Sequence, residues 1–170
     1  MSKVSPSFAT VTELVGALQA GECTAGGLLE QTFRSIDSLD GDINAFTDIT
    51  ADRARREAIA ADNARKRGAP ALAGIPYGVK NLFDIRGVTT RAGSKINREN
   101  LPAATDAFGV AALADAGAVC VGALNMGEYA YDFTGVNWMG RSRMVSTAVS
   151  AQAFVDARKA KKSAASREYL

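Results

Sequence analysis

The sequence predicts an α/β fold, in which N-terminal helices precede part of a mixed sheet that is itself flanked by helices. The segments 74–81 and 118–122 are short and apolar, as buried strands are. A helical segment ending at residue 116 lies between them, and a strand, a crossover helix and a second strand form a βαβ unit. Amphipathic patterns of helical period also precede the first of these strands.

Composition narrows the class of protein. The chain has 170 residues, enough for one domain with a sizeable core, and its 47% hydrophobic and 22% charged residues are typical of a globular protein. The net charge of +2 gives no reason to propose nucleic acid or an anionic membrane as a partner. The sequence has no apolar run of membrane-spanning length and no signal-peptide pattern, so we expect a cytoplasmic protein without a membrane partner.

Cysteine and histidine usage restricts the chemistry. Cys23 and Cys120 lie far apart and match no metal or redox spacing, so we expect buried thiols and neither a metal nor a cofactor. The chain contains no histidine, which excludes a Ser-His-Asp triad, a Cys-His dyad and a histidine-rich zinc site within it. Hydrolytic chemistry in these residues needs another base, and lysine can serve when desolvation lowers its pKa.

Two helices are predicted at the start of the chain. Thr10 and Glu13 form a capping-box pattern, an apolar face follows, and Gly21 is placed to end the first helix. The second helix is predicted to begin after Thr24 and to carry an apolar stripe at helical spacing. We expect it to end by the Asp-Gly pair at 40–41, a turn sequence.

A short strand is predicted over 43–49, where apolar and polar residues partly alternate. Thr50 is placed to cap a third helix over 51–67, and Gly68 and Pro70 follow it. This helix has one narrow face of alanine and isoleucine. We expect its polar side, rich in arginine and acidic residues, to be a solvated surface.

The next segments surround a lysine. The predicted strand 74–81 carries Lys80 near its end. Residues 84–106 have little periodicity and many turn formers, which predicts a long, structured loop, and such loops are often functional. Thr105 or Asp106 can cap the helix that follows.

The last thirty residues differ from the rest. Residues 141–170 contain no glycine and have seven lysine or arginine residues against two acidic ones. The alanine-rich part of this segment, 147–162, predicts a helix, and its basic run could bind nucleic acid or acidic lipid. We favour a solvated tail, because one short basic cluster without interleaved aromatic residues is weak evidence for nucleic-acid binding.

Residues 72–94, LAGIPYGVKNLFDIRGVTTRAGS, resemble the start of the amidase signature family. In that family a Gly-Ile-Pro strand delivers a lysine, and a turn with Asp and Gly leads into a Thr-x-x-Gly-Ser segment. Residues 121–130, VGALNMGEYA, are similar to the family's Asn-Met-x-Glu-Phe/Tyr-Ala segment. Several motifs in the family's order are more specific evidence than a single motif. Within the family, the segment 121–130 is most similar to carboxybiuret-type hydrolases and their relatives, the glutamyl-tRNA amidotransferase A subunits.

The resemblance implies a hydrolase that cleaves the C–N bond of a small-molecule amide with a Ser–cis-Ser–Lys triad. In the family the neutral lysine takes a proton through the bridging serine, the second serine attacks the carbonyl, and backbone N–H groups stabilise the oxyanion. Lys80 corresponds to the lysine; without the motif it would be interpreted as a solvated strand-end lysine. The residues expected to line the substrate pocket are Asn125, Met126, Glu128 and Tyr129.

Several of these residues have a second interpretation. Met126 and Tyr129 are equally compatible with a core position, and Asn81 and Asp84 are interpreted as turn residues. The aromatic residues that follow could form an apolar ligand wall or a patch that meets a partner, and they are Tyr131, Phe133 and Trp138.

The family's pattern is lost after Asn137. Where the family has a Gly-Gly-Ser-Ser-Gly-Gly segment, Ser146 and Ser150 lack the neighbouring glycines that let several N–H groups face an anion. The family's spacing puts the nucleophile beyond residue 170. We therefore interpret residues 1–140 as the N-terminal part of an amidase domain, an incomplete amidase-signature fold, and 141–170 as a divergent basic tail, read out of frame or joined from elsewhere.

Three functions remain as alternatives. The first is a truncated amidase-family hydrolase that does not turn over by itself. The second is a non-catalytic binding or assembly module that pairs with a complementing chain or with copies of itself. The third, a nucleic-acid-binding tail on an inert domain, has the weakest support because of the modest charge.

Overall fold

The computed structural model describes residues 9–65, 68–131, 136–137 and 140–141, and it confirms the α/β class. Its α-helices are α1 (Val11–Ala20), α2 (Ala25–Ile43), α3 (Ala51–Ala64) and α4 (Phe108–Asp115). Its strands are β1 (Phe46–Ile49), β2 (Pro76–Lys80), β3 (Val119–Leu124), β4 (Val136–Asn137) and β5 (Gly140–Arg141). Two 3-10 helices, η2 (Lys95–Asn97) and η3 (Glu128–Ala130), lie in the loops.

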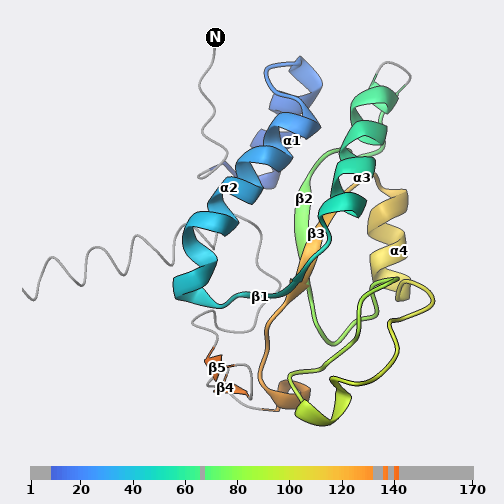
Figure 1. Ribbon diagram of the computed structural model, residues 1–170. Helices are drawn as coiled ribbons and strands as arrows, with labels where there is room; N and C mark the ends of the chain where they lie inside the picture. Colours follow the sequence, from blue (N-terminus) through green and yellow to red (C-terminus); the bar gives the residue numbers. More distant parts are fainter. Residues whose placement is uncertain (1–8, 66–67, 132–135, 138–139, 142–170) are drawn as a thin grey trace, which may run out of the picture.

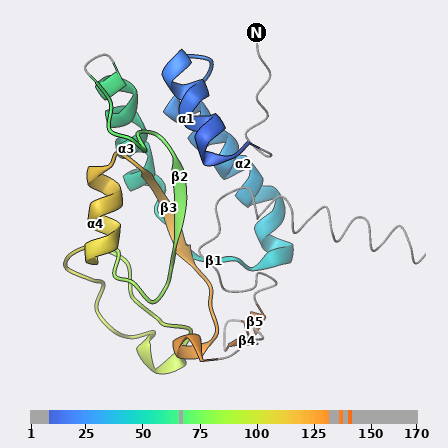
Figure 2. The same ribbon diagram turned by 180° about the vertical axis from the view of Figure 1, so that it is seen from behind.

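The sheet at the centre has the strand order β1-β3-β2 (Figure 1, and Figure 2 from behind). β3 pairs with β2 in parallel and with β1 in antiparallel orientation, so the sheet is mixed. The parallel pair is joined through α4, which confirms the predicted βαβ unit. Because β2 and β3 run in the same direction, their carboxyl ends lie at the same edge of the sheet.

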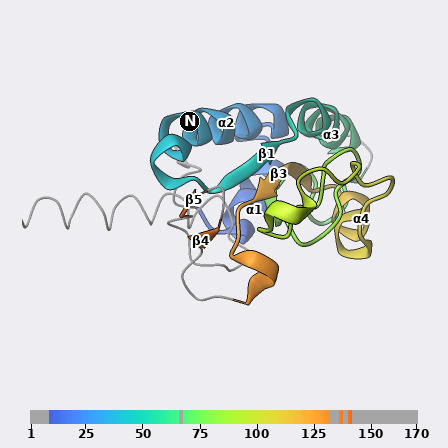
Figure 3. The same ribbon diagram turned by 60° about the horizontal axis from the view of Figure 1, so that its bottom comes forward.

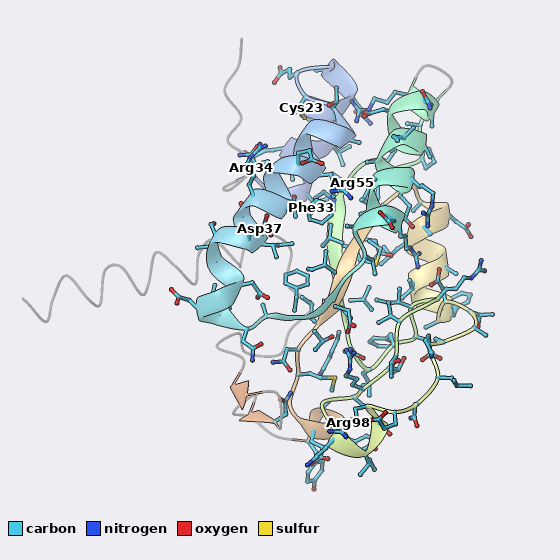
Figure 4. The ribbon with its side chains drawn as sticks, in the orientation of Figure 1. Cys23, Phe33, Arg34, Asp37, Arg55 and Arg98 are labelled. Carbon is cyan, nitrogen blue, oxygen red and sulfur yellow. The ribbon has the colours of Figure 1, made fainter. Side chains whose placement is uncertain are left out.

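Helices and loops cover both faces of the sheet. On one face α2 and α3 lie side by side (Figure 3), and their small and branched side chains pack on Val119 and Val121 of β3. At the outer surface of this pair, the Arg55 guanidinium lies 5.6 Å from the centre of the Phe33 ring (Figure 4). On the other face a second cluster joins α4 and the 81–107 loop to the sheet, through Val79, Ile85, Val110, Cys120 and Ala123.

The capping prediction for α1 is confirmed. The Thr10 side chain accepts a hydrogen bond from the Glu13 N–H at 3.2 Å, and a Glu13 carboxylate oxygen accepts from the Thr10 N–H at 2.6 Å. Gly21 ends the helix with φ of 73°, a left-handed conformation that glycine adopts without strain. Thr24 caps α2 by accepting from the Gly27 N–H.

The predicted end of α2 was wrong. The helix continues through Asp40 and Gly41 to Ile43, and the strand begins only at Phe46. Burial of Leu39 and Ile43, four residues apart on one face, favours the longer helix, and Asn44 then ends it with φ of 54°. Asp40 does serve a turn, because its carboxylate accepts the Ala45 N–H at 2.6 Å.

Two predicted helix caps do not form. Thr50 precedes α3, but its hydroxyl donates to the Cys120 carbonyl at 2.8 Å and so ties the start of α3 to β3. Asp106 lies before α4, but its carboxylate binds the Arg53 guanidinium through two bonds of 2.7 and 2.9 Å. In both cases the side chain bonds a partner distant in sequence and not the N–H groups of the helix that follows it.

The polar side of α3 is only partly the solvated surface that was predicted: Asp52 and Arg55 are exposed, but other charged residues bind neighbouring elements. Glu57 accepts the Cys120 N–H of β3 at 2.7 Å. Asp62 accepts the first two N–H groups of α2, at 2.8 and 3.0 Å. Arg65 donates to carbonyl groups at the end of α1 and just beyond it, those of Leu18 and Cys23. These charged groups bind backbone atoms of neighbouring elements, which the helical period alone does not predict.

Some expectations fall on residues outside the described ranges. They concern the predicted helix over 147–162, the serines at 146 and 150, and the aromatic residues Phe133 and Trp138. Where residues are described, none of the helices combines the length and the apolar character needed to cross a membrane.

Candidate functional site

The candidate site lies at the shared carboxyl edge of β2 and β3. Lys80, the last residue of β2, pairs in register with Leu124, the last residue of β3. Asn81 and Asn125 follow these strands directly. In open α/β sheets, ligands bind outside the carboxyl ends of the strands, so this edge is the place where chemistry is expected.

Lys80 is half-buried at this edge. Val79, the residue before it, packs in the cluster with α4, and side chains alternate along a strand, so Lys80 projects from the opposite face of the sheet. The ion pairs among the described residues all use arginine, and the Lys80 ammonium takes part in none of them. The amine is therefore not neutralised by a carboxylate of the described residues.

Asn81 is 1% exposed and joins three segments of the chain. Its side-chain N–H donates to the Thr47 hydroxyl of β1 at 2.6 Å, and its side-chain oxygen accepts the Arg91 N–H at 2.8 Å. Its backbone N–H donates to the Leu124 carbonyl at 3.0 Å, and its backbone carbonyl accepts the Ala92 N–H at 2.8 Å. A buried amide with every group bonded fixes the geometry around it.

The turn over 90–94 lies against the residues that follow β3. A Cβ atom at Gly93 would come within 2.5 Å of the Met126 carbonyl oxygen, and Gly93 has φ of 68°. Only glycine fits this approach and this backbone conformation. The next residue, Ser94, is 1% exposed, and its hydroxyl donates to the Glu128 carboxylate at 2.5 Å.

The four residues predicted to line the substrate pocket, Asn125, Met126, Glu128 and Tyr129, form one short segment in contact with this turn. The Asn125 amide donates to the Asn44 carbonyl at 3.0 Å, and its oxygen accepts from the Met126 N–H at 2.9 Å. Met126 is 1% exposed, whereas Tyr129 is 51% exposed. The structure thus brings the segment to the same edge as Lys80, with some of its side chains buried and others open to solvent.

Backbone strain marks the junction between the turn and this segment. Ala92 and Tyr129 have φ of 49° and 48°, in the left-handed region that residues with a side chain rarely adopt. The Tyr129 N–H donates to the Ala92 carbonyl at 2.8 Å, so the two strained residues hold each other. Such strain persists only where the surrounding contacts determine it, and it clusters at functional sites.

The sequence prediction missed three polar residues of the site, which are Thr47, Asn81 and Ser94. Asn81 was interpreted as a turn residue, and Ser94 was recognised only as the end of a motif. The available signal was the position of both residues inside the resembling segment 72–94. Thr47 carried no signal, because its partner is 34 positions away in the sequence.

The cysteines do not supply a nucleophile. Cys120 is buried, as predicted, while Cys23 is only half-buried. Burial raises the pKa of both thiols, so both stay protonated at neutral pH. Within the described ranges, no three residues of the types His, Cys, Asp and Glu cluster closely enough to hold a metal ion.

Comparisons with known proteins point to a single family. The amidase family model matches residues 27–143. The 1-carboxybiuret hydrolase subunit AtzE of Pseudomonas sp. strain ADP is 53% identical over 127 residues, which are 74% of this chain and 28% of that protein. The A subunit of glutamyl-tRNA(Gln) amidotransferase from Chromohalobacter salexigens is 43% identical over 122 residues, which are 71% of this chain and 25% of that protein.

Solved structures agree with the sequence matches. A vestigial protein complex related to the origin of an s-triazine catabolic enzyme has a chain that is 49% identical, with a TM-score of 0.77, and the match covers 79% of this chain and 30% of that one. The crystal structure of an amidase, 34% identical, has a TM-score of 0.70 over 79% of this chain and 31% of that one. The chain therefore spans less than a third of the length of these relatives.

Proposed function

The chain belongs to the amidase family, and we propose that Lys80 is the catalytic lysine of a site that hydrolyses amide bonds. The observation that supports this proposal is the position of Lys80. It ends β2 at the carboxyl edge of the sheet, inside the region that the family model matches, and the residues around it are tightly bonded.

The proposed chemistry is acyl transfer with a Ser–cis-Ser–Lys triad. The neutral lysine accepts the proton of the bridging serine, which in turn deprotonates the nucleophilic serine as it attacks the amide carbon. Lysine must be neutral for this step, and desolvation favours the neutral amine.

We assign the segment after β3 to the substrate side of the site. Glu128 and Tyr129 are the exposed members and would face a substrate, whereas Asn125 and Met126 are buried and would hold the segment in place. The substrate class we propose is a small-molecule amide. Similarity to a 1-carboxybiuret hydrolase subunit makes 1-carboxybiuret the first compound to test.

Residues 1–170 alone are proposed not to turn over. The glycine-free segment 141–170 offers no Gly-Gly-Ser sequence that could hold the bridging serine and the oxyanion donors. Its composition supports an origin out of frame or from elsewhere. Translating the coding DNA beyond codon 137 in all three forward frames tests this idea, and a Gly-Ser-rich stretch in another frame is the expected result.

The catalytic proposal is tested in a chimera. Residues 27–137 replace the matching segment of the Pseudomonas AtzE subunit, and ammonia release from 1-carboxybiuret is measured. We expect the chimera to be active and Lys80→Ala to lower kcat by about 10³-fold or more, as loss of a triad member does. Lys95→Ala is the control, because Lys95 is exposed on η2 and should leave kcat unchanged. Equal activity of Lys80→Ala and the unmodified chimera would refute the role of Lys80.

A non-catalytic assembly role is the second candidate, and one observation favours it. Large apolar side chains are exposed among the described residues, with Leu101, Phe108 and Tyr131 at 89%, 90% and 93%. Such side chains favour a partner, either a second copy or a complementing chain. Sedimentation analysis over a range of concentrations tests this role, and a monomer at every concentration would contradict it. If the chimera also released no ammonia, neither function would be supported.

A further inference from the structure

We propose that Asn81 is a positioning residue that fixes the direction in which Lys80 leaves the sheet. The inference rests on the proposed catalytic role of Lys80, and its evidence is the hydrogen bonding of Asn81 and of the backbone next to it. No contact between Asn81 and a substrate is required.

The bonding of Asn81 differs from that of an ordinary turn asparagine. A turn asparagine bonds its own backbone about two residues further on. The Asn81 amide instead reaches Thr47, 34 positions earlier, and Arg91, 10 positions later. Since the backbone N–H of Arg91 can only donate, the amide orientation is determined: the oxygen faces the 90–94 turn and the N–H group faces β1.

The peptide group between Lys80 and Asn81 is bonded at both ends. Its N–H donates to the Leu124 carbonyl, and its carbonyl accepts the N–H groups of Leu82 at 2.6 Å and Phe83 at 3.1 Å. A peptide group is planar, so these bonds fix the backbone on the carboxyl side of the Lys80 Cα. The strand pairing with β3 fixes the other side. The direction of the Lys80 Cα–Cβ bond is therefore determined by backbone bonds, and the side-chain amide of Asn81 supports them by tying the same residue to Thr47 and Arg91.

Two segments of the site, β1 and the 90–94 turn, are bonded to the Asn81 side-chain amide. Thr47 belongs to β1, on the far side of β3 from β2, and Arg91 begins the turn that Gly93 and Ser94 continue. Loss of the amide would remove one bond to β1 and one to the turn, and would leave the Arg91 N–H without its acceptor, while the backbone bond from Ala92 to Asn81 remains. Lys80 would then sample directions that the intact edge excludes.

The test uses the full 170-residue chain and reads the lysines individually. Acetic anhydride acetylates neutral amines, and mass spectrometry gives the acetylation rate of Lys80 relative to Lys95 as a function of pH. In Asn81→Ala we expect this ratio to change by about threefold or more, because local opening exposes a half-buried amine. Asn63→Ala, at an exposed position of α3, is the matched control and should leave the ratio unchanged.

Further variants separate positioning from general stability. Asn81→Asp keeps an acceptor for the Arg91 N–H but loses the donor to the Thr47 hydroxyl, so it should change the ratio less than Asn81→Ala does. If Asn81→Ala does not fold, Thr47→Val removes the bond to the Asn81 amide and a longer one to the Ala123 carbonyl, keeps the bond from the Arg91 N–H to Asn81, and should change the ratio in the same direction.

The outcomes distinguish the two claims. If Asn81→Ala folds and its acetylation ratio is unchanged, the positioning role is overturned, even if urea unfolding shows a loss of stability. If only Thr47→Val folds, an unchanged ratio in that variant overturns it. A changed ratio supports it whether or not Lys80 is catalytic. The catalytic role fails separately, if Lys80→Ala leaves the chimera active.

Discussion

At the scale of single residues, short polar side chains hold the site together. Ser94 and Glu128 join the turn after β2 to the segment after β3, and Ser94 is almost fully buried. A buried hydroxyl that loses its acceptor costs more than the bond itself stabilises, because it is then neither bonded nor hydrated. Loss of the Ser94–Glu128 hydrogen bond should therefore lower the stability of the chain.

We expect Glu128→Ala to lower the free energy of unfolding by about 1–3 kcal/mol, because the Ser94 hydroxyl is left buried without a partner. Glu99→Ala is the control: the Glu99 side chain is 79% exposed, and its substitution should change stability by less than about 0.5 kcal/mol. Urea unfolding at neutral pH measures both. Equal stability of the two variants would mean that the Ser94 contact contributes nothing.

The sequence predicted Lys80 but not the residues that hold it. Lys80 stands in an apolar strand and inside a motif, so both its local pattern and its order in the chain carry information. Asn81 and Ser94 are residue types common in turns, and each has a side-chain partner 34 positions away, Thr47 and Glu128. Local patterns do not report contacts of that separation.

At the scale of elements, the close approach of β1 to β3 depends on Gly122. A Cβ atom there would overlap the carbonyl oxygen of Asp48, which is backbone and cannot turn away. The irregularity in the β1–β3 register lies beside it, between Phe46 and Asp48. A side chain at residue 122 would push the two strands apart.

Gly122→Ala is expected to destabilise the fold by about 1–3 kcal/mol, as overpacking of a closely packed interior does. Gly109→Ala provides the comparison. An added Cβ at Gly109 meets nothing within 4 Å, and the residue lies in α4, so alanine should stabilise by about 0.4–1 kcal/mol. Thermal unfolding of the two variants should shift in opposite directions, and a common direction would contradict the described β1–β3 packing.

Helix α3 stabilises its neighbours through charged side chains. Asp62 accepts the first two N–H groups of α2, which the helix itself cannot bond. We expect Asp62→Ala to cost about 1–2 kcal/mol, comparable to loss of an N-cap. In the same helix Asp52 is 91% exposed, so Asp52→Ala should change the urea midpoint little. A similar midpoint for both variants would contradict the capping role.

Helix and strand positions were largely predictable, and the caps were only partly so. The Thr10 capping box and the start of α2 after Thr24 follow from neighbouring residues and were predicted. The hydroxyl of Thr50 and the carboxylate of Asp106 bind other elements instead, and a local motif gives no information about such competition. The same reason explains the error at the end of α2, where burial decided the boundary.

At the scale of the whole molecule, Asp106 links α3 to the long loop and makes stability depend on pH. Burial alone would raise its pKa, but two hydrogen bonds from Arg53 and one from the Arg86 N–H hold the pKa below its usual range. A carboxyl group with a depressed pKa in the folded state stabilises at pH values above its unfolded pKa, about 3.9. That contribution is lost as the pH falls through the folded pKa.

We therefore expect Asp106→Asn to lower the free energy of unfolding at pH 7 by about 1–3 kcal/mol. The difference from the unmodified chain should shrink as the pH falls below about 4, because the Asp106 carboxyl is then protonated in the unfolded state and, at lower pH, in the folded state too. Urea unfolding at both pH values measures the difference. A difference that is constant with pH would contradict the role of the Arg53 pair.

The central claim concerns what Lys80 does for the whole active site, and Lys80→Arg tests it most directly in the chimera with AtzE. Arginine keeps the positive charge but does not give up its proton at neutral pH. If Lys80 accepts a proton, we expect ammonia release to fall by about 10³-fold or more, with Lys95→Arg unchanged. If Lys80→Arg retains activity, the residue supplies only charge, and the proposed proton transfer is wrong.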